Sequence, residues 1–168
     1  MTISMYQTAV PVTVRALENL AHVLKKGAEH AAVKSVTDQT LLQTRLIPDM
    51  LPLVKQVQIA TDMAKNGVAR LAGVEPLKFD DTETTLDELQ ARIARAVEYI
   101  QTFTPEQIDG SETRAITMKT RNGELNFEGQ SYLLDFVFPN VFFHCTTAYN
   151  ILRESGAELG KQDFIGKA

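Results

Sequence analysis

Apolar residues recur at three- and four-residue intervals along four stretches of the chain. Residues at this spacing share one face of an α-helix, so each stretch predicts a long helix with one apolar stripe. Stripes of this kind pack against one another in the core of a helical bundle. The four predicted helices span residues 4–26, 48–72, 85–103 and 131–155.

Glycine, proline and capping residues mark the ends of these predicted helices. Gly27, Gly73 and Gly156 follow three of the four stretches, and glycine readily takes the left-handed conformation that closes a helix. Pro48 predicts a first helical turn, where a missing backbone N–H has no cost. Thr85 opens a capping-box pattern and predicts the start of the third helix.

The apolar spacing changes to strict alternation before the last predicted helix. Residues 113–128 alternate apolar and polar positions on either side of Asn122-Gly123, and Asn-Gly is the strongest short signal for a β-hairpin turn. Two strands alone are marginally stable, so we expect one face of the hairpin to cover the bundle. That face carries Ile116, Met118, Leu125 and Phe127.

These elements predict an all-α fold, an up-down four-helix bundle with a small β-hairpin inserted before the last helix. The length of 168 residues fits one domain, so we expect residues 1–168 to form a single helical-bundle domain. The tail after Gly156 has too few apolar residues for a fifth long helix.

The last predicted helix is apolar on almost every side. One bundle core covers only one side of a helix, and its aromatic residues extend beyond that side. Because exposed aromatic surface promotes aggregation, we expect a homodimer formed through these aromatic faces. Pro139 interrupts the segment, with either a kink or a stop and restart. A kink would open space near Asn140 and His144.

Composition and charge exclude several classes of protein. The net charge is −4 and lysines and arginines are scattered, so neither nucleic acid nor an anionic membrane is an expected partner. The acidic stretch DDTET at residues 80–84 is interpreted as a helix start with solvated charge. A single cysteine, no signal-peptide pattern and no long apolar run together favour a cytoplasmic protein.

His144 is the residue of greatest chemical interest, because helical spacing directs it toward the core. Asn140 lies one turn earlier on the same side, while Asp49 and Gln56 lie near the edge of the second helix's apolar face. Arg45 precedes that helix and would either pair with Asp49 or hold an anion. These five residues are candidates for a small-molecule pocket.

A metal ligand and a core histidine are alternative interpretations of His144. A site for zinc or nickel can be drawn from His144, His30 and Asp49, but one turn from His144 no strong ligand occurs. In the alternative, His144 is bonded to Asn140 or to a backbone carbonyl, and no cofactor is expected. Cys145 is expected to be buried and inert, since apolar surroundings raise a thiol pKa.

Three segments of the chain resemble an uncharacterised bacterial family within the DinB/YfiT-like superfamily. They are LIPDMLPLVKQVQIATDMAK at 46–65, DTETTLDELQARIARAVEYI at 81–100 and FPNVFFHCTTAYNILRESGAELGKQDFIG at 138–166. The resemblance covers nearly the whole chain and implies a four-helix bundle that is commonly dimeric. For many members it implies a divalent metal held by three histidines, and for some a thiol S-transferase activity.

The chain departs from that superfamily pattern at the place of the metal centre. Two histidines four residues apart are expected on the last helix, whereas Asn140 and Ala148 flank His144. Three hypotheses therefore stay open. The chain is a dimeric DinB-like bundle that binds a small molecule near His144, a metal-dependent enzyme such as a thiol S-transferase with His144 as one ligand, or a structural, partner-binding module.

Overall fold

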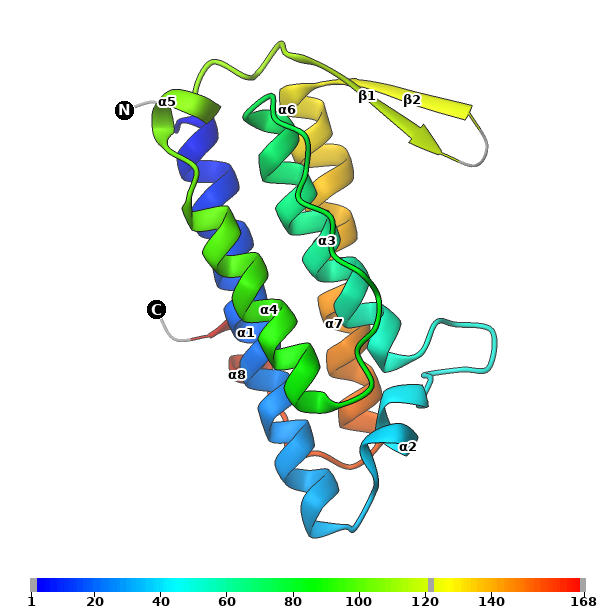
Figure 1. The fold of residues 1–168 in the computed structure, drawn as a ribbon. Coiled ribbons are helices and arrows are strands. Elements are labelled where there is room, and N and C mark those ends of the chain that lie inside the picture. The colour runs from blue at the N-terminus through cyan, green and yellow to red at the C-terminus, as the bar shows by residue number, and fades with distance from the viewer. Residues whose placement is uncertain (1–2, 121–122, 167–168) are drawn as a thin grey trace.

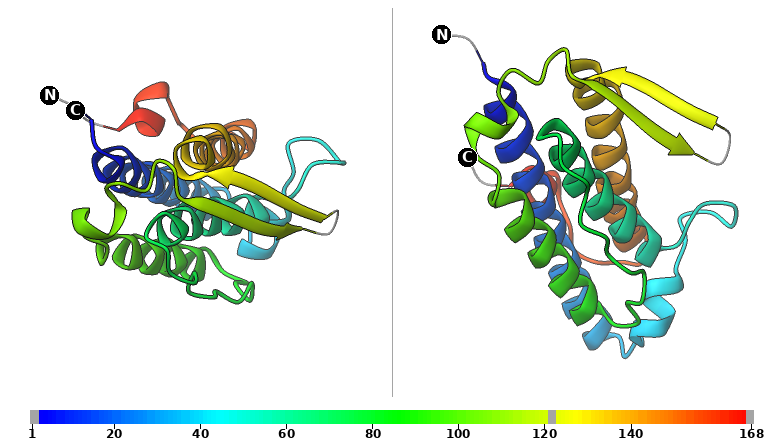
Figure 2. Two further views of the ribbon diagram at one scale, coloured as in Figure 1. Left: turned by 90° about the horizontal axis from the view of Figure 1, so that it is seen from above. Right: turned by 45° about the horizontal axis from the view of Figure 1, so that its top comes forward.

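Four long helices form the body of the protein. The computed structural model describes residues 3–120 and 123–166, and the helices lie side by side over most of their length (Figures 1 and 2). The all-α bundle predicted from the sequence is confirmed. The helices are α1 (Met5–Val33), α3 (Leu53–Leu71), α4 (Leu86–Gln101) and α7 (Phe138–Glu154).

The order of helices around the bundle is α1, α4, α3, α7, so α1 and α3 face each other across the core. Helices α1 and α7 run in one direction, and α3 and α4 run in the other (Figure 1). The parallel direction of α3 and α4 requires a long crossover, because a short turn would make them antiparallel. Residues 72–85 supply it by running back along the outside of α3.

Small residues on α3 allow the last helical segment to approach closely. Ala60 and Ala64 are fully buried, and a methyl group placed at Gly67 would lie 2.7 Å from Cγ1 of Val137. Interiors are packed at nearly crystalline density, so this contact leaves no room for a larger side chain. These small residues therefore set the close distance between α3 and the last helical segment.

Two of the predicted helix ends are wrong, for a physical reason in each case. Gly27 lies inside α1, which continues to Val33. The position is a glycine because Leu152 of α7 packs directly against its backbone, where a side chain would clash. Pro48 lies in a turn, and α3 begins at Leu53 after an extended Pro52. A second proline four residues further on serves as the helix start instead.

Other predicted ends are confirmed by their hydrogen bonds. The Thr85 hydroxyl accepts from the backbone N–H of Glu88, and the Glu88 carboxylate accepts in return from the Thr85 N–H, which is a complete capping box. Gly73 and Gly156 have positive φ angles of 74° and 99°, as expected for residues that close a helix.

Short elements complete the fold. The hairpin of β1 (Ala115–Thr120) and β2 (Gly123–Glu128) pairs Ile116 with Phe127, and both side chains pack at the top of the bundle. Leu125, predicted on the covering face, is 40% exposed, because the hairpin extends sideways beyond the helices (Figure 2). Asn122 of the predicted turn lies outside the described residues. The short helices are α2 (Asp38–Gln43), α5 (Pro105–Ile108), α6 (Gly129–Ser131) and α8 (Lys161–Ile165).

A π-helical turn, η1 (Tyr132–Val137), leads directly into α7 and accommodates Pro139. The backbone N–H of Phe138 donates to the carbonyl of Leu133, five residues earlier. Pro139 falls in the first turn of α7, where it needs no N–H. The side-chain amide of Asn140 donates to the Phe136 carbonyl at 2.7 Å. The segment therefore continues through the proline with a local widening of the helix.

Candidate functional site

His144 lies on α7 opposite Gln56 of α3, and the two side chains are hydrogen-bonded. The distance from Nδ1 of His144 to Oε1 of Gln56 is 2.7 Å. Gln56 is 1% exposed, and its Nε2 donates to the carbonyl of Leu51 at 2.8 Å. Both ends of the buried amide are therefore satisfied, as a buried polar group requires.

This pairing fixes the protonation of the imidazole. The Leu51 carbonyl accepts only, so the amide nitrogen of Gln56 must face it and the amide oxygen must face His144. Nδ1 of His144 consequently carries the proton, and Nε2 of the neutral ring has the lone pair. Burial lowers the pKa of His144 below 6.5, because it disfavours the charged form, so the ring is neutral at pH 7.

The residues around His144 do not fit the three-histidine metal centre that the superfamily resemblance implies. Gln56 bonds His144 from α3 through a neutral amide, and Asn140 donates its amide hydrogen to a backbone carbonyl. Within residues 3–120 and 123–166, no three His, Cys, Asp or Glu side chains are grouped closely enough to hold a metal ion.

The remaining predicted site residues lie away from this pair. Arg45 and Asp49 are exposed, and the Arg45 guanidinium donates to the Met50 carbonyl rather than forming the expected ion pair with Asp49. His30 follows the predicted first helix, residues 4–26, but lies near the end of α1 because that helix is longer than predicted. Its ring is beside Gly156. Of the five pocket candidates, His144 and Gln56 are the two joined by a hydrogen bond.

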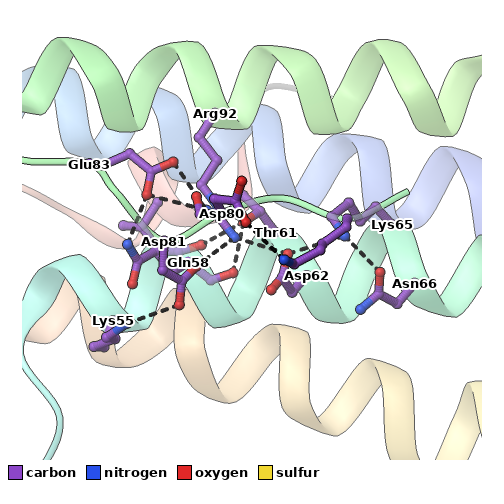
Figure 3. A network of polar contacts seen from close by, with 12 residues as sticks. Lys55, Gln58, Thr61, Asp62, Lys65, Asn66, Asp80, Asp81, Glu83 and Arg92 are labelled. Carbon is purple, nitrogen blue, oxygen red and sulfur yellow. Dashed lines mark hydrogen bonds and ion pairs between the residues drawn. The ribbon is translucent and has the colours of Figure 1, made fainter. Parts of the chain in front are cut away.

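A buried arginine on α4 forms the densest polar network in the described part of the chain (Figure 3). The side chain of Arg92 is fully buried, and it forms ion pairs with Asp62, Asp81 and Glu83 at 3.0–3.1 Å. Its Nε also donates to the hydroxyl of Thr61 at 2.9 Å. Asp81 and Glu83 belong to the DDTET stretch. The predicted solvated charge is wrong for Glu83, which is 8% exposed, whereas Asp81 is 43% exposed. Arg92 follows these two residues by eleven and nine positions, and no local sequence pattern indicated that they would pair.

Lys65 ties the same crossover to α3. Its ammonium group is 2% exposed and contacts the Asp62 carboxylate, the Asn66 side chain and the Leu77 carbonyl. Burial lowers its pKa below 10.5, and the ion pair with Asp62 opposes that shift. Each charge in this network has an opposite charge beside it, so its arrangement favours a structural role, holding residues 72–85 against α3 and α4.

A cavity of about 260 Å³ lies between α1, α7 and the C-terminal residues. Its wall is almost entirely apolar, and among the residues that the structure describes the polar side chains lining it are Arg15 and Asn19. The main apolar residues of the wall are Ala16, Leu20, Val23, Phe142, Cys145 and Phe164. We call this space the strap cavity.

Residues 157–166, here named the C-terminal strap, cover this cavity. Figure 2 shows the strap, which contains α8, lying along the α1–α7 side of the bundle. The Asp163 carboxylate accepts from His22 at 2.9 Å and from Lys26 at 3.1 Å. The hydrogen bond from the Gly160 N–H, together with those from His22 and Lys26, lowers the pKa of Asp163 to about 2. The strap is thus fastened to α1 by polar contacts along one edge.

Sequence reasoning missed the strap cavity because its two sides come from opposite ends of the chain. One signal was present: the polar residues Arg15, Asn19, His22 and Lys26 recur at helical spacing and form a second stripe on α1. A polar stripe usually faces water, so its partner in the tail was not predictable from spacing alone.

A four-helix bundle with a parallel middle pair and an inserted hairpin defines the class to which this protein belongs. Comparison with known proteins identifies the family within this class. Residues 5–165 match the family described as a domain of unknown function, DUF1993, and the chain belongs to that family. A crystal structure of a DinB family member protein from Shewanella denitrificans is similar, with 37% identity, a TM-score of 0.88 and coverage of 97% of this chain and 92% of that one. A search of curated proteins found no match.

Proposed function

We propose that this protein binds a small, mainly apolar molecule in the strap cavity. The observation that carries this proposal is the cavity of about 260 Å³ with an almost wholly apolar wall. The cavity opens to solvent beside the exposed side chains of Arg15, Phe142 and Ile165, so a ligand can enter it. A space of this size and chemistry is unfavourable for water, which needs polar partners, and favourable for an apolar ligand.

The volume supports a ligand of modest size. A cavity of about 150 Å³ is enough for benzene when its wall is apolar. The strap cavity, at about 260 Å³, has room for a single aromatic ring with a short chain. Phe142 and Phe164 in the wall offer ring surfaces to such a molecule.

The chemistry of the wall favours binding over thiol catalysis. Cys145 is the one sulfur in contact with the cavity, and burial raises its pKa to about 12. A thiol with this pKa stays protonated near neutral pH, whereas the thiolate is the reactive form. A metal-dependent transferase centred on His144 has less support, because the residues around His144 do not fit such a centre.

The proposal is tested by filling the cavity. Ala16 lines the cavity and Ala94 is exposed on α4, so Ala16→Leu and Ala94→Leu add the same atoms inside and outside it. We expect 4-phenylbutan-1-ol to bind the unaltered protein in calorimetric titration, Ala16→Leu to weaken binding at least about tenfold, or about 1.4 kcal/mol, and Ala94→Leu to change nothing. Equal affinities of Ala16→Leu and the unaltered protein would overturn the proposal.

Homodimerisation through the aromatic faces of the last helix stays a prediction. Its support is the exposure of Phe142 and Phe143, which are 40% and 56% exposed on adjacent positions of α7. A second copy of the chain is one way to cover such surface. Sedimentation at micromolar concentration is expected to give a dimer, and Phe143→Ser is expected to shift it to monomer. A monomer before substitution would contradict this prediction.

A further inference from the structure

The edge of the strap cavity presents hydrogen-bond donors. Asn19 donates to the Ile165 carbonyl at 2.8 Å, and Arg15 donates to the same oxygen through Nε and Nη2 at 3.3 and 3.2 Å. One and two turns further along α1, His22 and Lys26 hold the carboxylate of Asp163. The groups that this edge holds are therefore oxygen acceptors, one of them anionic.

Two of these donors also line the cavity itself. Arg15 and Asn19 are polar residues in an otherwise apolar wall. Ligand sites commonly combine an apolar wall with a few polar groups that fix orientation. A guanidinium group matches a carboxylate in shape, since it offers two parallel N–H donors to two oxygens.

We propose that the ligand of the strap cavity is a small monocarboxylate with an apolar tail. The tail fills the cavity, and Arg15 and Asn19 hold the carboxylate at its mouth. This inference rests on the proposed function and adds the charge of the ligand to it. The strap already combines these two features. Its Phe164 side chain lies in the cavity wall, and the groups on either side, the Asp163 carboxylate and the Ile165 carbonyl, accept hydrogen bonds from α1.

Binding of a carboxylate requires an adjustment of the strap at one point. The Ile165 carbonyl accepts from both Arg15 and Asn19, and an ionised carboxylate forms stronger bonds with a guanidinium than a neutral carbonyl does. The ligand therefore displaces the Ile165 carbonyl, while Asp163 keeps its bonds to His22 and Lys26. The strap remains fastened at Asp163 and moves only at its end.

A matched pair of probes tests this inference. 4-Phenylbutyrate and 4-phenylbutan-1-ol share a tail and differ in the charge of the head group. We expect the unaltered protein to bind the carboxylate at least about tenfold more tightly than the alcohol at pH 7 and low salt, and the difference to shrink as salt rises.

Arg15→Gln separates the head group from the tail. We expect this variant to lose the preference for 4-phenylbutyrate and to bind the alcohol as before. Arg95→Gln is the matched control, because Arg95 lies on α4 against Phe79, away from the cavity lining, and its loss changes the net charge equally. Arg95→Gln is expected to keep the preference.

The outcomes distinguish the two proposals. If the alcohol and the carboxylate bind with equal affinity, or if Arg15→Gln keeps the preference, the inference about charge is overturned and the proposed function stands. If neither probe binds the unaltered protein, both are overturned. If Arg15→Gln weakens both probes equally, Arg15 acts only through the strap, and the carboxylate assignment fails.

Discussion

Gln56 and His144, which are 88 residues apart in the sequence, are joined by a 2.7 Å hydrogen bond between Oε1 and Nδ1. The bond links the first turn of α3 to the middle of α7. Because the Gln56 amide is also bonded to the Leu51 carbonyl, it connects three segments of the chain.

Removing this amide is expected to destabilise the bundle. Gln56→Leu keeps the size of the side chain but leaves the His144 N–H and the Leu51 carbonyl without their partner. An unsatisfied buried polar group costs about 1–3 kcal/mol, so we expect a loss of this order in the free energy of unfolding in urea. Gln101→Leu on the exposed end of α4 is the control and is expected to have little effect. Equal effects would show that the bond contributes nothing.

The stability of the protein is expected to depend on pH through His144. Its folded pKa lies below 6.5, so the unfolded chain binds the proton more readily. Stability is therefore full above pH 6.5 and falls as the pH drops below that value toward the folded pKa. NMR titration of the imidazole should give a pKa below 6.5. His144→Gln should flatten the dependence in this window, whereas His22→Gln should leave the part due to His144 in place.

Asp163 is expected to control the closure of the strap. Its pKa of about 2 lies below the ordinary 3.8, so its contribution is present above pH 3.8 and is lost as the pH falls toward 2. Asp163→Asn should raise the hydrogen-exchange rates of residues 157–166 by about tenfold at pH 7 with little change in the core helices. Asp135→Asn removes an exposed carboxylate from η1 and should leave the strap unchanged. Unaltered exchange in Asp163→Asn would contradict this role.

Arg92 is expected to be essential for the crossover. Arg92→Leu leaves the buried Glu83 carboxylate without its cation, whereas Asp62 and Asp81 are partly exposed and keep Lys65 and Lys55. Breaking a buried ion pair on one side costs about 3–5 kcal/mol, and we expect a loss near the lower end of this range. The urea midpoint should fall accordingly. Arg95→Leu removes an exposed cation that lies over the Phe79 ring and should cost less than about 1 kcal/mol. A similar loss in both variants would show that the network is dispensable.

The sequence predicts the long helices and the hairpin but not the contacts between them. Apolar periodicity predicts the four long helices, and the pairing of Thr85 with Glu88 predicts one helix start, because both depend on nearby residues. Gly27 misled the prediction because its role is set by Leu152, which lies far along the chain. A glycine has the same appearance in the sequence whether it closes a helix or admits a neighbour.

In the candidate site, too, local spacing predicts where a residue lies but not which distant residue it contacts. Helical spacing directs His144 inward, but its partner was expected to be Asn140 or a backbone carbonyl and is Gln56 of another helix. Asn140 instead donates to the Phe136 carbonyl beside the π-helical turn. The strap cavity is formed by α1, α7 and the C-terminal strap together, and a local sequence pattern cannot predict that three distant segments lie side by side.

The parallel arrangement of α3 and α4 has a consequence for assembly of the fold. Two helices joined by a short turn can pair as soon as they form, but α4 cannot take its place until residues 72–85 have travelled the length of α3. Once α4 is in place, the Arg92 side chain reaches Asp62 and Thr61 on α3, and these contacts depend on the direction in which α4 runs along α3. The buried guanidinium of Arg92 thus favours the observed direction of α4 over its reverse.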